Sequence, residues 1–131
     1  MVRTLVLVRH GKAEKAPDDS SDLYRELTPD GRHALEIAYP RTFSLLEDYD
    51  DVNVWSSPAI RAMQTAQVVA NVLGVDGIEV DQTLYDQNVD AIFAQISTTS
   101  EDTVVIVGHV PSLDAIASRL LGMTIRLNKG A

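Results

Sequence analysis

The most constraining feature of this sequence is the apolar run Leu5–Val8, which leads directly into Arg9, His10 and Gly11. A short apolar run without polar alternation is typical of a central parallel strand that is covered on both faces. In parallel α/β sheets, ligands bind beyond the carboxyl ends of such strands. We therefore expect Arg9 to offer its planar guanidinium to phosphate oxygens, and His10 to act as a nucleophile or as an acid or base. Gly11 should let the backbone turn and keep a side chain out of this crevice, so we count it among the substrate-binding residues.

A second apolar run, Thr103–Val107, ends in the same way, at Gly108 and His109. Histidine gains little from burial in a core. Two buried strands that each end in an imidazole beside a glycine therefore favour a functional role for both imidazoles.

Strand-like and helix-like segments alternate along the rest of the chain. Shorter strands are predicted at Val52–Trp55 and Ile78–Val80, and helices after Thr28, after Ser57, over Val89–Ile96 and from Pro111 to Leu121. This alternation predicts an α/β fold with a three-layer α/β/α arrangement and a mainly parallel central sheet. The length of 131 residues fits one domain, which we place at residues 1–131.

Cap and turn residues give finer expectations for two helices. Thr28 should cap the first of them, and Pro40 should end or kink it. Ser57 should cap the next, with Pro58 in its first turn, and Gly74 should stop it.

Arg61 lies near the start of the helix that follows Ser57, where free N–H groups and the helix dipole favour an anion. A cation is mildly unfavourable at this end of a helix, and a bound anion would reverse that cost. We therefore expect Arg61 to complete a phosphate clamp with Arg9 and His109 at the carboxyl edge of the sheet.

Two segments beside this edge are predicted to be loops. Glu14–Asp22 is a candidate rim of the crevice. Arg25 just beyond it could reach this rim, but is interpreted as a solvated arginine. The loop Asp81–Asn88 contains Tyr85 and Asp86, and Asp90 follows it; each of the three could donate a proton at the crevice.

The composition excludes several classes of function. A formal net charge of −8 argues against nucleic-acid or anionic-membrane surfaces, which need clustered Lys and Arg. The chain has no cysteine, so disulfides and thiolate metal sites are excluded. We find no secretory signal or membrane-spanning segment and expect a cytoplasmic location.

Taken together, these motifs resemble the histidine phosphatase superfamily. The matching residues are Arg9-His10-Gly11, Ser56-Ser57-Pro58 with Arg61, Gln64-Thr65-Ala66, and Val107-Gly108-His109. The resemblance implies a phosphoglycerate mutase-like fold. The small size and the segment from Arg25 to Thr28 resemble the SixA-type phosphohistidine phosphatases.

The resemblance implies that His10 attacks phosphorus and becomes a phosphohistidine, while Arg9, Arg61 and His109 hold the equatorial oxygens. His10 must then attack as a neutral imidazole, and His109 would be more useful protonated. We expect no cofactor and no metal, because no close ligand spacing such as His-x-x-x-His occurs and the arginines would repel a divalent cation.

The sequence departs from the larger family members in two places. They carry a glutamate as general acid after the third strand, where this chain has Leu84-Tyr85-Asp86-Gln87-Asn88. Either Asp86 substitutes as the proton donor, or the leaving group of the substrate needs little protonation. Phosphohistidine would be a substrate of the second kind. The chain also stops soon after a predicted last strand at Met123–Leu127, so we expect a domain shortened at its C-terminus.

The sequence therefore favours a phosphatase that removes phosphate from phosphohistidine on a signalling protein, with a histidine-containing phosphotransfer domain as the partner that the resemblance suggests. Two alternatives stay open. One is a small-molecule phosphomonoesterase, for which a small phosphate ester is the substrate and Asp86 protonates the alcohol. The other is a non-catalytic module that binds phosphoproteins.

Overall fold

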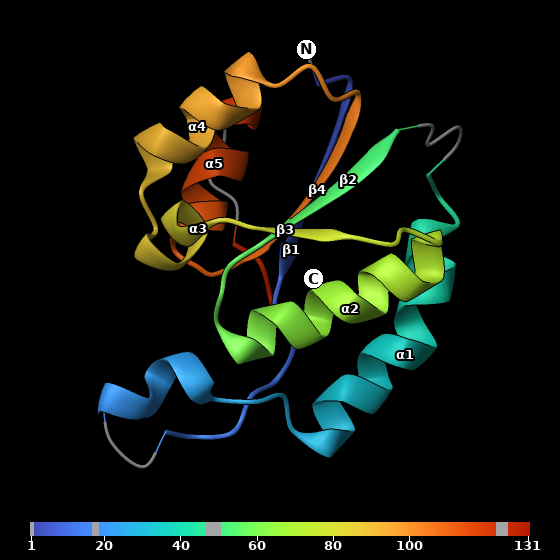
Figure 1. Cartoon of the computed structure of the whole chain (residues 1–131), viewed down its shortest axis with the longest axis vertical. Helices are drawn as coiled ribbons and strands as arrows, with labels where there is room; N and C mark the ends of the chain where they lie inside the picture. Colours follow the sequence, from blue (N-terminus) through green and yellow to red (C-terminus); the bar gives the residue numbers. More distant parts are fainter. Residues whose placement is uncertain (1, 17–18, 47–50, 123–125) are drawn as a thin grey trace.

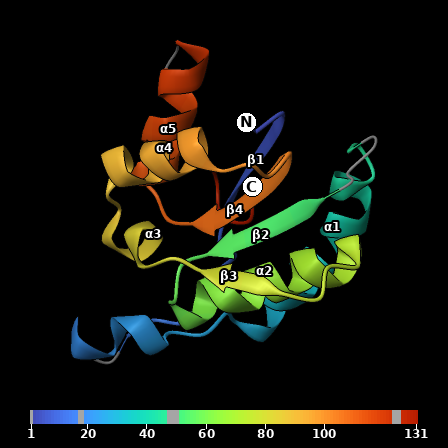
Figure 2. The same cartoon turned by 45° about the horizontal axis from the view of Figure 1, so that its top comes forward.

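The computed structural model describes residues 2–16, 19–46, 51–122 and 126–131. Within these residues, four strands form one sheet in the order β1-β4-β2-β3, and every strand pair is parallel (Figures 1 and 2). The strands are β1 (Thr4–Arg9), β2 (Val52–Ser56), β3 (Ile78–Val80) and β4 (Thr103–Gly108). This sheet confirms the predicted α/β class.

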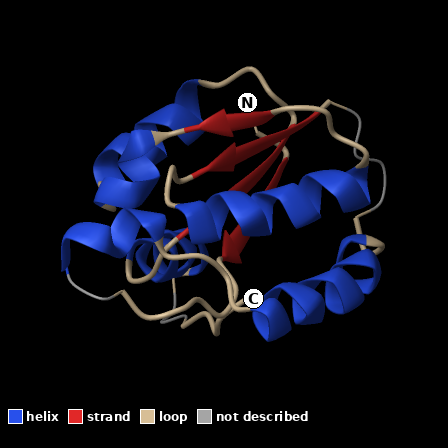
Figure 3. Ribbon diagram, turned by 60° about the horizontal axis from the view of Figure 1, so that its bottom comes forward, coloured by secondary structure: helices blue, strands red, loops and turns tan. Residues whose placement is uncertain are grey.

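Helices cover both faces of the sheet (Figures 1 and 3). One face carries α1 (Pro29–Phe43) and α2 (Ile60–Leu73), and the other carries α3 (Gln82–Asp86), α4 (Val89–Thr98) and α5 (Ser112–Leu121). A 3-10 helix, η1 (Asp19–Tyr24), lies beside the first turn of α2 (Figures 1 and 2). Among the described residues, no helix combines the length and apolar character that a membrane span requires.

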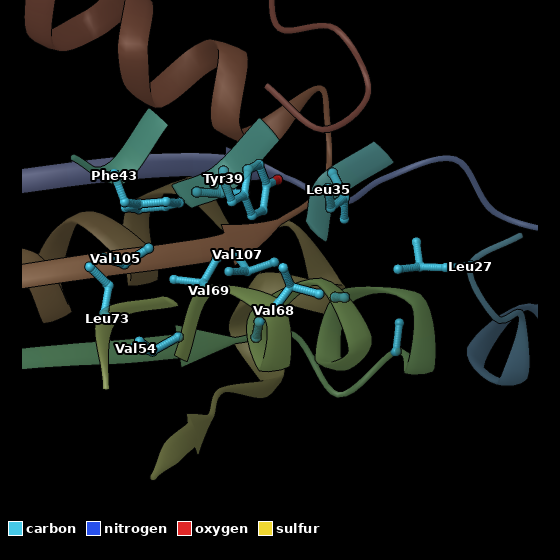
Figure 4. Close-up of a cluster of buried hydrophobic side chains, with 14 residues drawn as sticks. Leu27, Leu35, Tyr39, Phe43, Val54, Val68, Val69, Leu73, Val105 and Val107 are labelled. Carbon is cyan, nitrogen blue, oxygen red and sulfur yellow. The ribbon is translucent and has the colours of Figure 1, made fainter. Parts of the chain in front are cut away.

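The central strand β4 is buried along its whole length, and its side chains alternate between two apolar clusters. Val105 and Val107 pack with side chains of α1 and α2, including Tyr39 and Leu73 (Figure 4). Val104 and Ile106 point to the opposite cluster with residues of α3, α4 and α5. Burial on both faces explains why this strand is apolar without alternation.

Helix α1 begins as its cap residue predicts, since the Thr28 hydroxyl accepts a hydrogen bond of 2.9 Å from the Gly31 N–H. The prediction that Pro40 ends the helix is wrong, because α1 continues through it to Phe43. Pro40 lies only in the last turn, where its missing N–H removes a single helical bond. The buried rings of Tyr39 and Phe43 flank the proline and keep this turn packed against the core.

Helix α2 begins later than predicted. Its N-cap is Ala59, and no side chain caps it, so the assignment of Ser57 as the cap is wrong. The Ser57 hydroxyl instead accepts from the Ala59 N–H at 3.2 Å, in the turn that precedes the helix. Gly74 does end α2, in the left-handed conformation at φ 70°.

The predicted loop Asp81–Asn88 contains a short helix, α3, which the Asp81 carboxylate caps at the Thr83 N–H. Part of the predicted strand Met123–Leu127 lies outside the described residues, and residues 126–127 are not in a strand. In this tail the Ala131 carbonyl accepts a hydrogen bond from the Arg9 N–H at 2.8 Å.

Gly31 offers a test of the contact between the first loop and α1. A Cβ at this position would lie 2.6 Å from the Lys12 carbonyl oxygen, which is backbone and cannot move aside. We expect Gly31→Ala to lower the free energy of unfolding by about 1–3 kcal/mol, as overpacking does, although alanine normally favours a helix. Urea denaturation measures this change.

Gly77→Ala is the matched control, because no heavy atom lies within 4 Å of a Cβ there. It should change the free energy of unfolding by less than about 0.5 kcal/mol. Equal effects of the two substitutions would contradict the steric argument.

Candidate active site

The register of the sheet brings the two predicted imidazoles together. Arg9 pairs with Gly108 across β1 and β4, so the next residues, His10 and His109, leave the sheet side by side. The His10 N–H donates to the Gly108 carbonyl at 3.1 Å. The two imidazole centroids lie 5.2 Å apart in an edge-to-face arrangement.

These imidazoles open on a cavity of about 440 Å³ beyond the carboxyl ends of the strands. The structure brings together four of the predicted site residues on its walls, namely Arg9, His10, Arg61 and His109. Five further residues line the same cavity: Asp22, Arg25, Tyr85, Gln87 and Val110.

His10 is held as a neutral imidazole in one tautomer. Its Nδ1 lies 2.7 Å from the Gly11 carbonyl oxygen, which can only accept, so Nδ1 carries the proton. The lone pair is therefore on Nε2. Burial, followed by the nearby charges of Arg61 and Arg9, lowers the pKa of His10 to about 4, even though the bond to Gly11 opposes that shift. At neutral pH the ring is therefore uncharged, with its lone pair free on Nε2.

His109 is also neutral, contrary to the expectation that it would be protonated. Burial lowers its pKa to about 3, and the charge of Arg61 acts in the same direction, as does the charge that His10 carries once it is protonated. Its Nε2 lies 2.8 Å from the Ser57 hydroxyl, at the end of β2. The serine thus orients the second imidazole.

Arg61 is 5% exposed, and its guanidinium is held at its outer end by one residue. Nη1 donates to the Asp22 carbonyl at 2.7 Å, and Nη2 to the Asp22 carboxylate at 3.2 Å. Its Nε is buried and has no hydrogen-bond partner among the described residues. A buried, unpaired N–H is rare in native proteins and marks a donor suited to a bound acceptor.

The first backbone N–H groups of α2 are less available to a bound anion than the sequence suggested. The Arg61 N–H donates to the Arg25 carbonyl at 3.0 Å, and those of Ala62 and Met63 donate to Ala59. Anion binding at this helix start therefore depends on the Arg61 side chain rather than on these backbone groups.

Arg9 repeats the pattern of Arg61. Its Nη1 donates to the Leu127 carbonyl at 2.9 Å, while its Nε is buried without a partner among the described residues. The site thus contains two guanidinium groups, each anchored at one end and each with a buried, unused Nε–H.

Sequence reasoning placed Asp22 in the candidate rim without a role of its own, and interpreted Arg25 as solvated. In the structure, the Asp22 carboxylate accepts from the Tyr85 hydroxyl at 2.8 Å and from Arg25 Nη1 at 3.1 Å. Arg25 also donates from Nε to the Glu14 carbonyl at 2.7 Å. The only local signal was the spacing of Asp22 and Arg25 by three residues, which suits an ion pair on a helical turn.

Gln87 was also missed, because its place depends on backbone conformation. It ends α3 with φ 55°, which is uncommon for a residue with a side chain. Its Oε1 accepts from the Ser112 N–H at 2.9 Å, at the start of α5 and close to His109.

Three candidates from the sequence lie away from the cavity. Asp86 is exposed in the last turn of α3, where its carboxylate accepts from Gln82 at 3.1 Å, and Asp90 is exposed in the first turn of α4. Gly11 does not border the crevice, since a Cβ there would meet Leu35 at 3.0 Å and Leu27 at 3.3 Å. A side chain at this position would crowd the core, so the expectation that Gly11 keeps a side chain out of the crevice is wrong.

The arrangement suits phosphoryl chemistry. A neutral imidazole nucleophile faces the same cavity as two guanidinium groups that can neutralise the charge spreading over phosphate oxygens. Among the residues that the structure describes, no group of three or more His, Asp or Glu side chains is arranged to hold a metal ion.

Solved structures with this architecture include several phosphatases. The chain superposes on a proposed phosphohistidine phosphatase SixA from Agrobacterium tumefaciens with a TM-score of 0.78 and 26% identity, over 93% of this chain and 79% of that one. A proposed phosphohistidine phosphatase SixA from Nakamurella multipartitia gives a TM-score of 0.69 and 34% identity, over 86% of this chain and 62% of that one.

More distant structures show the fold alone. A phosphoglycerate mutase from Plasmodium falciparum is 16% identical, with a TM-score of 0.66 over 92% of this chain and 70% of that one. The phosphoglycerate mutase-like fold is thus confirmed.

Among curated protein sequences, no match to this chain was found. The family model of the histidine phosphatase superfamily (branch 1) matches residues 5–92, which include Arg9, His10 and Arg61. The chain therefore belongs to the histidine phosphatase superfamily, branch 1.

Proposed function

We propose that this protein is a phosphatase that acts through a phosphohistidine intermediate on His10, and that its substrate is phosphohistidine on another protein. The observation that carries this proposal is the pairing of a neutral, oriented imidazole with two guanidinium groups, each with a buried Nε–H that has no partner among the described residues. Such a site offers a nucleophile and fixed positive charge, which are the two requirements of phosphoryl transfer.

In the first step, the Nε2 lone pair of His10 attacks phosphorus in line with the leaving group. A new N–P bond forms, and the bond from phosphorus to the leaving group breaks, with its electron pair departing on that group. Arg9 and Arg61 donate hydrogen bonds to the equatorial oxygens, on which negative charge is spread. In the second step, water attacks phosphorus, the His10 N–P bond breaks, and orthophosphate is released.

The absence of a carboxylic acid proton donor on the described cavity wall favours phosphohistidine as substrate. Asp22 is the one carboxylate among these residues, and hydrogen bonds from Tyr85 and Arg25 outweigh its burial and lower its pKa to about 2. An alkoxide has a conjugate acid with a pKa near that of water, about 15.7, whereas that of imidazole is about 6.5. A phosphohistidine whose other ring nitrogen carries a proton releases neutral imidazole, so no acid on the cavity wall has to protonate the leaving nitrogen.

The structural relatives support the same substrate class. The two SixA structures from Agrobacterium tumefaciens and Nakamurella multipartitia are proposed phosphohistidine phosphatases. A protein histidine phosphatase SixA solved with tungstate shares the fold, with a TM-score of 0.76 at 24% identity, over 96% of this chain and 83% of that one. We propose a phosphorylated protein, such as a histidine-containing phosphotransfer domain, as the partner. The reaction as written uses no metal and no cofactor.

The proposal is tested by measuring phosphate release, in the presence of a chelator, from a phosphohistidine-bearing phosphotransfer domain and from an alkyl phosphate. We expect release from phosphohistidine, and a loss of at least about a thousandfold in His10→Ala, which lacks the nucleophile. Asp86→Asn should leave the rate unchanged, because its carboxylate lies outside the cavity.

Two other results of this assay would indicate a different function. Comparable release from the alkyl phosphate, with a loss in Asp86→Asn, would indicate a small-molecule phosphomonoesterase. No release from either substrate, with phosphoprotein binding retained in His10→Gln, would indicate a binding module.

The ionisation of the nucleophile can be tested directly. Because the pKa of His10 is about 4, we expect its imidazole to be neutral, with the proton on Nδ1, from pH 8 down to about pH 5. Nitrogen-15 NMR of the two ring nitrogens reports both the charge and the tautomer. A midpoint near 6.5, the value expected of the same histidine in the urea-unfolded chain, would contradict this prediction.

The two neutral imidazoles also make stability depend on pH. In the unfolded chain each recovers a pKa of about 6.5, whereas in the folded protein the values are about 4 for His10 and about 3 for His109. Below pH 6.5 the unfolded chain therefore binds more protons, and the free energy of unfolding should fall as the pH is lowered from 7 to 5. Urea denaturation at both pH values measures this, and the loss should be smaller in His10→Gln.

A further inference from the structure

We propose that Asp22 is a positioning residue for phosphoryl binding, which holds the outer end of the Arg61 guanidinium so that its Nε edge is left for the substrate. This inference rests on the proposed function, since the ligand it concerns is a phosphoryl group. It assigns a role in the site to η1, an element that lies between β1 and α1 in the sequence.

The hydrogen bonds of Arg61 carry the argument. A guanidinium can bind an oxyanion through its two Nη groups or through one Nη and Nε. Asp22 occupies the first of these edges with two acceptors, its carbonyl oxygen and its carboxylate Oδ2. The Nε–H remains buried and without a partner among the described residues, on a side chain that lines the cavity. The second edge is therefore the one available to phosphate oxygens.

Asp22 is itself fixed from two other elements. The Tyr85 hydroxyl, from α3, donates to Oδ2, and Arg25 donates to Oδ1. The Tyr85 ring also lies edge-to-face against His109, with the centroids 5.7 Å apart. Because Asp22 is fixed by these hydrogen bonds, it holds Arg61 in one orientation relative to both imidazoles.

Arg61 needs such a partner. It is almost fully buried near the N-terminus of α2, where the helix dipole disfavours a cation. A buried charge that loses its partner is strongly destabilised and tends to move toward solvent. Without the Asp22 carboxylate, the guanidinium would keep only its Nη1 bond to the backbone carbonyl of residue 22, and one bond does not fix its orientation.

The test is the affinity for inorganic orthophosphate, measured by isothermal titration calorimetry on the full chain at pH 7. We expect Asp22→Asn to raise the dissociation constant about tenfold, as loss of an orienting partner commonly does, and Asp22→Ala to raise it at least as much. The sign of the change is informative, because removing a negative charge from the cavity would by itself strengthen phosphate binding. Asp90→Asn removes an exposed carboxylate on α4 and should leave the affinity unchanged.

A double-substitution cycle shows whether the effect passes through Arg61. In an Arg61→Gln background, Asp22→Asn should no longer weaken orthophosphate binding, because the group it orients is gone and only the loss of a negative charge from the cavity remains. Thermal unfolding of each variant identifies any that do not fold. If Asp22→Ala does not fold, the inference is judged on Asp22→Asn, which keeps the shape of the side chain.

Two results would overturn the inference. If Asp22→Asn binds orthophosphate as tightly as the unaltered protein or more tightly, the carboxylate competes with phosphate rather than positioning its ligand. If the loss is the same with and without Arg61, Asp22 does not act through Arg61. Because the assay measures binding without turnover, a failure of the proposed phosphatase activity is recognised separately.

Discussion

The active site depends first on the parallel register between β1 and β4. Pairing of Arg9 with Gly108 puts His10 and His109 next to each other, and a slip of β1 by one residue would turn its side chains to the opposite face and separate the two imidazoles. The register is fixed by burial, because the side chains of β4 must match apolar clusters on both faces of the sheet. The positions of the catalytic groups are thus a consequence of core packing.

In this site the positive charge is carried by the two arginines, whereas the imidazoles are uncharged. The guanidinium groups of Arg9 and Arg61 stay charged, and burial and their fields keep His10 and His109 neutral at physiological pH. Arg61 has Asp22 as its counter-ion, which partly offsets the cost of burying a cation. An oxyanion entering this cavity therefore meets fixed donors, and little reorganisation is needed to stabilise it.

The sequence predicted those parts of the molecule that follow from periodicity and strand order. The apolar runs of β1 and β4 identified the sheet, and their ends identified Arg9, His10 and His109. Asp22 and Arg25 were not identifiable, because their roles arise from a loop that folds back onto α2, and no period in the sequence encodes such a contact. Asp86 was predicted as a proton donor only from its place after the third strand. The five-residue helix α3 turns its carboxylate to solvent, while Tyr85 and Gln87 line the cavity.

The pairing of β1 with β4 also affects how the chain folds during its synthesis. Thr4 in β1 pairs with Thr103 in β4, and β1 has no other strand partner within the described part of the chain. During synthesis, the apolar β1 emerges first and must wait for β4 before it is covered, and such non-local pairing is slow and exposed to aggregation. A nascent chain that ends before β4 contains His10 but not His109, so the cavity that both imidazoles line forms only once β4 has paired with β1.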